Sequence, residues 1–207
     1  MSYKTIRNRA SDSITIEKSE FIGVISPVRT DEEAVSFIES VRADNRKARH
    51  NCYAYILRDG FITRYSDDGE PQGTAGLPIL DVLQKNGLTD VVIVVTRYFG
   101  GILLGKGGLT RAYSNAASLA LNAAEIVEML SGYYLTIESD YSWYERIIRC
   151  LGEQGARVDN TEFAENVKLT AAVKAEACDR LTEALVDLTN GSVNIVKSDE
   201  TTIDFSR

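Results

Sequence analysis

The chain has 207 residues, of which 44% are apolar and 26% are charged. This length and balance suit one large domain or two small ones that each bury a core, and they exclude a globally disordered chain. The sequence has no run of about eighteen apolar residues and no apolar signal segment at its N-terminus, so we expect a cytoplasmic protein with no membrane partner. The formal net charge of −7 argues against a protein that coats nucleic acid through bulk charge.

The first part of the chain is predicted to mix strands and helices. We expect strands at residues 13–17, 21–28, 52–57, 61–65 and 91–95, and helices that start at Asp31, Pro78 and Leu109. The run at 91–95 is entirely β-branched, which is typical of a central strand buried on both faces. Alanines at every fourth position of the last helix favour close packing on a sheet.

The second part predicts a different arrangement. Strands are expected at residues 133–138, 157–163, 166–173 and 193–205, and helices at 142–153 and 176–188. The resulting order, βαββαβ, is that of a ferredoxin-like domain. The sequence therefore predicts an α+β protein with two domains, at residues 1–130 and 131–207.

Negative charge is concentrated in the second domain. Residues 1–128 hold 15 Lys and Arg against 16 Asp and Glu, a net charge of −1, whereas residues 129–207 hold 8 against 14, a net charge of −6. We therefore expect any anion-binding site in the first domain, as a local patch. The acidic second domain could instead face a basic protein partner.

Cysteine and histidine usage limits metal and redox chemistry. Cys52, Cys150 and Cys178 lie far apart, and no pair has metal-ligand or redox spacing. We expect three buried, unreactive thiols. With His50 as the single histidine, the sequence predicts no histidine-based metal site, and we expect neither a metal nor a cofactor.

A glycine-rich stretch follows the buried strand and precedes the alanine-rich helix. It holds Arg97, Tyr98, Gly100, Gly101, Gly105, Lys106, Gly107, Gly108 and Arg111. Glycines leave backbone N–H groups exposed, and a helix N-terminus adds unpaired donors, so these residue types can seat a phosphate. Tyr98 and Phe99 could offer a stacking face for a base. The alternative is a tight crossover with no ligand, and we expect Phe99 itself in the core.

Two further clusters of charge lie in loops of the first domain. Asp67, Asp68 and Glu70 could hold a divalent metal, serve acid/base chemistry, or form a turn that orients Arg97 or Arg111 through an ion pair. We favour the turn, and we expect Thr74 to cap the helix near Pro78.

The second cluster is basic. Arg46, Lys47, Arg49 and His50 are candidates for phosphate contacts, and a solvated surface loop is the equally weighted alternative. His50 could titrate near neutral pH, but the sequence offers it no obvious partner carboxylate for catalysis.

Two long motifs carry a resemblance. One runs from Asp67 to Leu80 and the other from Val94 to Ser114, and together they resemble the IMPACT family, whose bacterial members are the YigZ-like proteins. The resemblance implies an N-terminal domain of the ribosomal-protein-S5 domain-2-like fold. It also implies a C-terminal domain similar to a ferredoxin-like domain of the translocation elongation factor G, and an association with translation.

We therefore expect a translation-linked regulatory factor, without enzymatic activity, that binds RNA or the ribosome through an anion-binding groove in the first domain. Two alternatives stay open. One is an enzyme that acts on a phosphorylated or nucleotide ligand, with a carboxylate of the acidic loop holding a metal or a proton. The other is a protein-binding regulatory adaptor that uses its acidic second domain.

Overall fold

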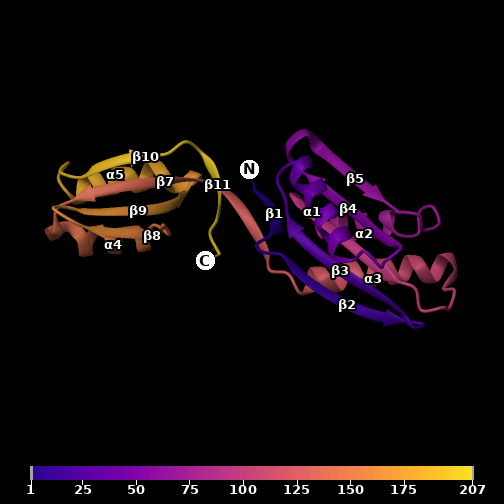
Figure 1. Ribbon diagram of the computed structural model, residues 1–207. Helices are drawn as coiled ribbons and strands as arrows, with labels where there is room; N and C mark the ends of the chain where they lie inside the picture. Colours follow the sequence, from indigo (N-terminus) through magenta and orange to yellow (C-terminus); the bar gives the residue numbers. More distant parts are fainter. Residues whose placement is uncertain (1, 207) are drawn as a thin grey trace. The chain divides into compact units, whose positions relative to one another are not determined.

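The computed structural model describes residues 2–206, which form two compact units. The N-terminal unit spans Tyr3–Val127, and the C-terminal unit contains the residues from Glu128 onward together with Ser2. Both units combine helices with antiparallel strands (Figure 1). The α+β class and the two-domain organisation predicted from the sequence are confirmed.

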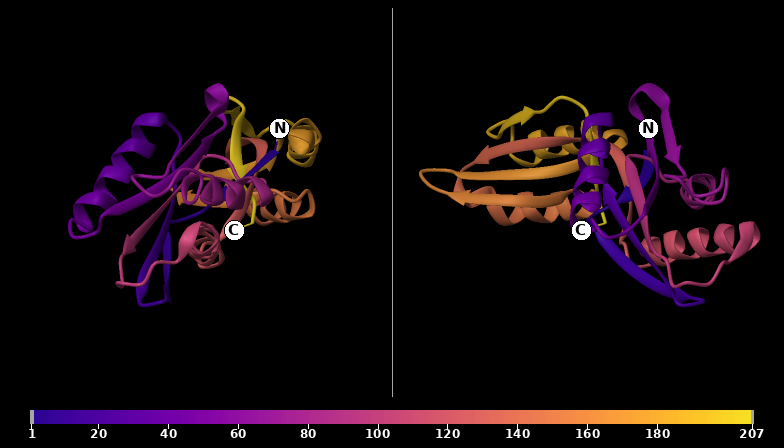
Figure 2. Two further views of the ribbon diagram at one scale, coloured as in Figure 1. Left: turned by 90° about the vertical axis from the view of Figure 1, so that its right-hand side faces the viewer. Right: turned by 45° about the vertical axis from the view of Figure 1, so that its right-hand side comes forward.

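A five-stranded antiparallel sheet forms the centre of the N-terminal unit, in the order β2-β3-β6-β4-β5. Its strands are β2 (Ala10–Ile16), β3 (Ser19–Pro27), β4 (His50–Leu57), β5 (Ile62–Ser66) and β6 (Val91–Tyr98). One face of the sheet carries α1 (Asp31–Asp44), and the other carries α2 (Gly76–Lys85) and α3 (Gly105–Asn122) (Figure 2).

The central strand β6 is buried on both faces, as its β-branched run predicts. Val91, Ile93 and Val95 pack with α2 and α3, whereas Val92 and Val94 pack with α1. All five side chains are fully inaccessible to solvent. Burying one such side chain stabilises the fold by about 1.5–3 kcal/mol, so this strand joins two separate hydrophobic clusters into one domain.

Local signals fix the start of α1. The Thr30 hydroxyl accepts a hydrogen bond from the backbone N–H of Glu33 at 3.2 Å, which satisfies one unpaired donor of the first turn. Asp31, Glu32 and Glu33 add negative charge where the helix dipole favours it. The helix buries Ala34, with two other apolar residues, against the sheet.

The C-terminal unit has the strand arrangement of a ferredoxin-like fold. Its elements are β7 (Ile126–Ser139), α4 (Tyr144–Glu153), β8 (Arg157–Phe163), β9 (Val167–Lys174), α5 (Cys178–Leu188), β10 (Asn194–Lys197) and β11 (Thr201–Asp204). The neighbours run β10-β7-β9-β8, and all three pairings are antiparallel. One long final strand was expected, but it is broken into β10 and β11, and the short strand β1 (Ser2–Ile6) was not predicted.

Helix α3 lies close to β3 because the residues between them are small. A Cβ atom on Gly23 would lie 2.5 Å from the backbone oxygen of Ala116 and 3.0 Å from the Cβ of Ala120. The backbone oxygen cannot rotate away as a side chain can. Position 23 therefore sets the distance between the sheet and α3.

We predict that Gly23→Ala destabilises the N-terminal unit by about 1–3 kcal/mol, because the added methyl group overpacks this contact. Hydrogen exchange of the β6 amides measures the effect. Gly107→Ala is the matched control, since its Cβ would meet only the flexible end of Arg111, at 3.7 Å. The control should be neutral or slightly stabilising, and equal protection in the two variants would contradict the packing argument.

Candidate functional site

Four connections of the N-terminal unit meet at one end of its sheet. The pairings Glu20↔Tyr98 and His50↔Arg97 bring the start of β3, the start of β4 and the end of β6 together. We call this region the loop end and define it as residues 17–18, 45–49, 67–75 and 99–104. The candidate site residues lie in this region or at the strand ends beside it, except for those on α3: Gly105, Lys106, Gly107, Gly108 and Arg111.

One residue of the loop end, Glu70, has a buried carboxylate. Glu70 Oε1 accepts hydrogen bonds from Arg97 Nη1 at 2.7 Å and from the Tyr113 hydroxyl at 2.8 Å. The Glu70 and Arg97 side chains are only 4% and 7% exposed. This cluster links the acidic loop to β6 and α3. Its Glu70–Arg97 contact is one of the ion pairs considered for the acidic loop in the sequence analysis.

The neighbouring Asp67 carboxylate organises the start of α2. It accepts hydrogen bonds from the backbone N–H groups of Gly73 at 2.8 Å, Ala75 at 3.0 Å and Gly76 at 2.9 Å. The expectation that Thr74 caps this helix is wrong, because its hydroxyl donates to the carbonyl of Pro71 at 2.6 Å. A carboxylate at a helix N-terminus satisfies the unpaired donors more strongly than a hydroxyl can.

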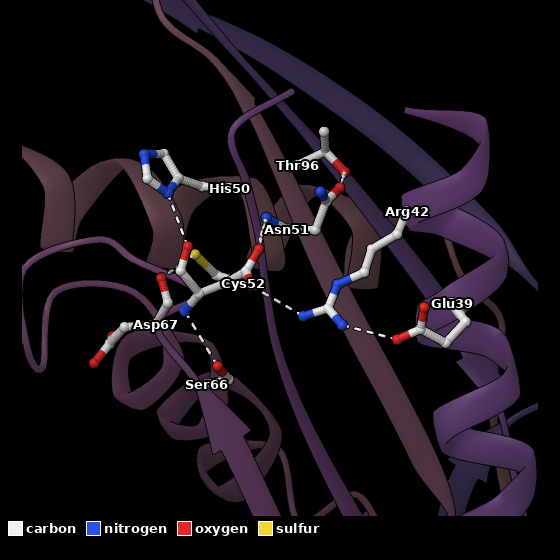
Figure 3. Close-up of polar contacts among 9 residues, drawn as sticks. Glu39, Arg42, His50, Asn51, Cys52, Ser66, Asp67 and Thr96 are labelled. Atoms are coloured by element: carbon white, nitrogen blue, oxygen red, sulfur yellow. Dashed lines mark hydrogen bonds and ion pairs between the residues drawn. The ribbon is translucent and has the colours of Figure 1, made fainter. Parts of the chain in front are cut away.

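Asp68 connects the same loop to β4 and α1, and its partners His50, Asn51 and Arg42 are labelled in Figure 3. Its carboxylate accepts hydrogen bonds from the backbone N–H of Asn51 at 2.7 Å and from Arg42 Nη2 at 3.0 Å. The carbonyl oxygen of Asp68 lies 2.8 Å from His50 Nδ1. A carbonyl only accepts, so Nδ1 is the donor in this contact.

All three carboxylates of the acidic loop are thus engaged by protein donors. Within residues 2–206, no group of three or more His, Cys, Asp or Glu side chains is placed so that it could hold a metal ion. The arrangement is that of a folded turn which fixes three neighbouring elements. It offers no carboxylate pair poised for proton transfer.

Cys52 is buried against this loop and is unreactive. Its thiol is fully buried and donates a hydrogen bond to the carbonyl of Asp67 at 2.9 Å. Burial raises the pKa of the Cys52 thiol and also that of the Tyr113 hydroxyl. Both groups therefore stay protonated and un-nucleophilic at neutral pH. Cys150, expected to be buried, is instead partly exposed.

The glycine-rich stretch is organised differently from the expectation. Helix α3 begins at Gly105 rather than Leu109, so Gly105, Lys106, Gly107 and Gly108 form its first turn instead of a loop. The preceding residue, Leu104, makes no side-chain cap. The N–H groups of a first turn have no partner inside their own helix, which leaves this end of α3 with the polarity that attracts anions.

The three cations of the glycine-rich stretch, Arg97, Lys106 and Arg111, are not exposed together. Arg97 is buried in its ion pair, whereas Lys106 and Arg111 are exposed on α3. Arg111 turns back toward the first turn, because a Cβ on Gly107 would lie 3.7 Å from Arg111 Nη1. Only Lys106 and Arg111 share the start of the helix.

Two hollows flank α3, and Arg111 borders both. One of about 580 Å³ lies between α2 and α3 and includes Asp81 and Lys85 in its lining. The other, of about 690 Å³, lies between α3 and the loop end and includes Glu17. Arg111 therefore lies on a ridge between two grooves of the N-terminal unit.

The basic loop is exposed, as a phosphate-contact patch requires. Arg46, Lys47 and Arg49 all reach solvent, and Arg46 Nε donates to the carbonyl of Ala43 at 3.2 Å. Tyr98 does not offer a free stacking face beside Arg97. It lies on the opposite face of the sheet, where its hydroxyl donates to Asn45 Oδ1 at 2.9 Å.

The loop after β6 is anchored by a close backbone contact. The N–H of Gly100 donates to the Ser19 hydroxyl at 3.1 Å, and a Cβ at this position would lie 2.0 Å from the backbone of Lys18. Gly101 has a φ of +86°, which glycine adopts without steric cost. Phe99 is 52% exposed, so its expected place in the core is wrong.

Several residues that build this region gave only weak signals in the sequence. Asn51 accepts a hydrogen bond from the buried Thr96 hydroxyl at 2.8 Å, and Arg42 reaches Asp68 from α1. Tyr113 lies on the alanine-rich, buried face of α3. A buried tyrosine hydroxyl needs a hydrogen-bond partner, so this residue is the one whose position in the sequence indicated a polar contact in the core.

Fold and sequence comparison together define the class. The Impact N-terminal domain model matches residues 17–121, and a second model, of a domain of unknown function called DUF1949, matches residues 137–192. The protein is thus a two-domain α+β protein that carries an Impact N-terminal domain.

The chain belongs to the IMPACT family. It is 39% identical to the IMPACT family member YvyE of Bacillus subtilis, over 98% of this chain and 94% of the relative. It is 35% identical to the IMPACT family member YigZ of Escherichia coli, over 89% and 92%. A crystal structure described as that of a hypothetical protein superposes with a TM-score of 0.62 at 33% identity, covering 94% of this chain and 96% of the other.

More distant relatives include the Saccharomyces cerevisiae Protein IMPACT homolog, 30% identical over 55% of this chain and 46% of the relative. At the level of the family, these relatives support a regulatory role related to translation. Among residues 2–206, no helix has the length and apolar character needed to cross a membrane.

We predict that Glu70→Ala lowers the free energy of unfolding of the N-terminal unit by about 3–5 kcal/mol, because Arg97 is left as an unpaired buried charge. Urea unfolding followed by far-UV circular dichroism, with hydrogen exchange at β6, measures the loss. The double variant Glu70→Leu, Arg97→Met should recover most of it.

The matched control is Glu39→Ala, which removes an exposed ion pair with Arg42 in the same unit. Its cost should stay below about 0.5 kcal/mol. A Glu70→Ala variant as stable as this control would show that the buried pair contributes nothing to the fold.

We also predict that stability falls as pH rises above about 8.5, the ordinary pKa of a cysteine thiol. The unfolded chain then loses the Cys52 proton while the folded chain keeps it, so the folded state binds more protons and loses stability. The slope approaches about 1.4 kcal/mol per pH unit for this one group. Comparing the unfolding free energies of the wild type and Cys52→Ala between about pH 8.5 and 10 tests this, and equal slopes would refute it.

Proposed function

We propose that the protein is a translation-related regulatory factor that binds RNA, free or within the ribosome, through the loop end and the start of α3. Family membership supports the link to translation. The geometry that supports RNA as the ligand is a set of exposed cations on an otherwise acidic chain.

The observation that carries this proposal is the difference between paired and unpaired cations. Arg7, Arg58 and Arg97 each pair with a carboxylate of the same unit. Within the part of the chain that the structure describes, ten cations of this unit have no carboxylate partner, and six of them lie at or beside the loop end: Lys18, Arg46, Lys47, Arg49, Lys106 and Arg111.

Unpaired surface cations suit phosphates for a physical reason. A carboxylate partner would have to be displaced before a phosphate could bind, whereas these groups need to shed only water and counterions. Arg111 adds a planar fork that matches two phosphate oxygens, and it lies beside the positive end of α3. Such contacts give affinity with little dependence on base sequence.

The C-terminal unit supports a second contact of a different kind. Residues 129–207 carry a net charge of −6, which repels nucleic acid and attracts basic protein surfaces. We infer that this unit faces a basic protein, such as one on the ribosome, while the N-terminal unit contacts RNA.

We predict that Lys106→Ala, Arg111→Ala weakens binding of a single-stranded RNA by about tenfold or more at low salt. Losing two phosphate contacts should also reduce the slope of log K against log salt by about 1.4, which is twice the value of about 0.7 per contact. Filter binding at several salt concentrations measures both quantities.

The control variant is Arg29→Ala, Arg64→Ala, which removes two exposed cations of the same unit away from the loop end. It changes the net charge equally, so bulk electrostatics predicts equal losses for the two variants. Equal losses, or no binding of RNA by the wild type, would contradict the proposed site. A melting temperature raised by one nucleotide with Mg²⁺ would favour the enzymatic alternative instead.

A further inference from the structure

We propose that Phe99 is a stacking platform for an unpaired base, so that the loop end prefers single-stranded RNA to duplex. The inference rests on the proposed function and deepens it, because it names the form of RNA that the site takes. Phe99 is 52% exposed although it directly follows β6, in which residues 91–97 are all buried.

The inner side of the ring rests on a buried cation. The Arg97 guanidinium carbon lies over the Phe99 ring, 5.4 Å from its centroid. The same carbon lies 5.4 Å from the centroid of Phe21, so the guanidinium contacts two rings. A guanidinium over an aromatic face is stabilising, and more so when it is shielded from water.

The contacts of Phe99 continue through Arg97 into the core. Glu70 holds Arg97 at 2.7 Å, and Phe21 packs edge-on against Tyr113 with ring centroids 5.3 Å apart. Phe21 and Tyr113 are fully buried. Phe99 therefore packs on a buried side chain that is itself held by an ion pair, while about half of Phe99 is open to solvent.

The backbone after Phe99 is fixed as well. Gly100 packs on the backbone of Lys18, where any Cβ would lie 2.0 Å away. Glu17 and Lys18 form the tip of the β2–β3 hairpin with φ values of +46° and +62°, a conformation that is unusual for such side chains. Two constraints, one on the side chain and one on the backbone, thus hold the ring in place before any ligand arrives.

A preformed, half-exposed aromatic ring beside unpaired cations suits one ligand chemistry. Stacking of a base on an aromatic side chain is worth about 1–3 kcal/mol, and every base offers a π face when it is unpaired. In a duplex those faces are covered by neighbouring bases, so only the phosphate contacts remain. The ring should therefore add affinity for single strands alone.

A second exposed ring in the same unit provides a comparison. Phe61, at the turn between β4 and β5, is 95% exposed, and within residues 2–206 it makes no contact with another ring or with a cation. Phe61 has the same side chain as Phe99 but lacks the contact with a buried guanidinium that Phe99 makes.

The experiment compares Phe99→Ala with Phe61→Ala on two fluorescently labelled probes, a 12-nucleotide single-stranded RNA and a duplex of the same length. We expect Phe99→Ala to weaken single-strand binding by about 5-fold to 150-fold, which corresponds to the stacking range of about 1–3 kcal/mol. Duplex binding should change by less than about twofold, and Phe61→Ala should leave both affinities unchanged. Phe99→Trp should restore single-strand binding.

Phe99→Leu guards against a loss of folding, because leucine keeps an apolar side chain but has no ring. It should lose single-strand affinity with unchanged hydrogen exchange at β6. Arg97→Lys tests the support: it keeps the charge and loses the planar contact, so single-strand preference should fall while the salt dependence stays the same.

The outcomes separate the two proposals. If Lys106→Ala, Arg111→Ala loses binding while Phe99→Ala behaves like Phe61→Ala, the stacking platform is wrong and the RNA site stands. If Phe99→Ala loses single-strand and duplex binding equally, the ring has no role specific to unpaired bases. If the wild type binds neither probe, both proposals fail.

Discussion

One carboxylate oxygen, Oε1 of Glu70, holds the functional end of the N-terminal unit together. It accepts hydrogen bonds from a strand residue, Arg97, and from a helix residue, Tyr113, in a place that water hardly reaches. A buried charge is strongly destabilising when its partners move away. Glu70 therefore fixes the acidic loop, β6 and α3 relative to one another. The loop that carries Glu70 also supplies the cap of α2 through Asp67. The orientation of β6, α2 and α3 at this end thus depends on a single acidic loop.

Much of this architecture could be predicted from the sequence, because it follows from patterns of burial. The run at residues 91–95 has no polar side, so it had to be a central strand covered on both faces. The alternation of strands and helices after Gly132 allowed the ferredoxin-like order. An arginine three residues before Gly100, together with the acidic loop at residues 67–70, allowed the ion pair of Arg97 to be considered, but the sequence did not indicate which carboxylate would make it.

The site itself could be predicted only in part, because its details depend on contacts between distant segments. Glycines at 105, 107 and 108 indicate a loop by their low helix propensity, yet packing of Leu109 and the alanines on the sheet carries the helix back to Gly105. Apolar character places Phe99 in the core, but the strand ends at Tyr98 and the inner position is already filled by the guanidinium of Arg97. No local sequence pattern indicates that Arg97 is buried while Phe99, two residues later, is exposed.

The contact between Gly100 and the β2–β3 hairpin has a consequence for how this protein can vary during evolution. Any side chain at position 100 would collide with the backbone of Lys18, which no change of rotamer can relieve. The hairpin tip is itself in a left-handed conformation at two successive residues, so it has little room to move. Substitutions of Gly100 and of the hairpin are therefore not independent, and a lineage could abandon this glycine only by rebuilding the turn in the same step.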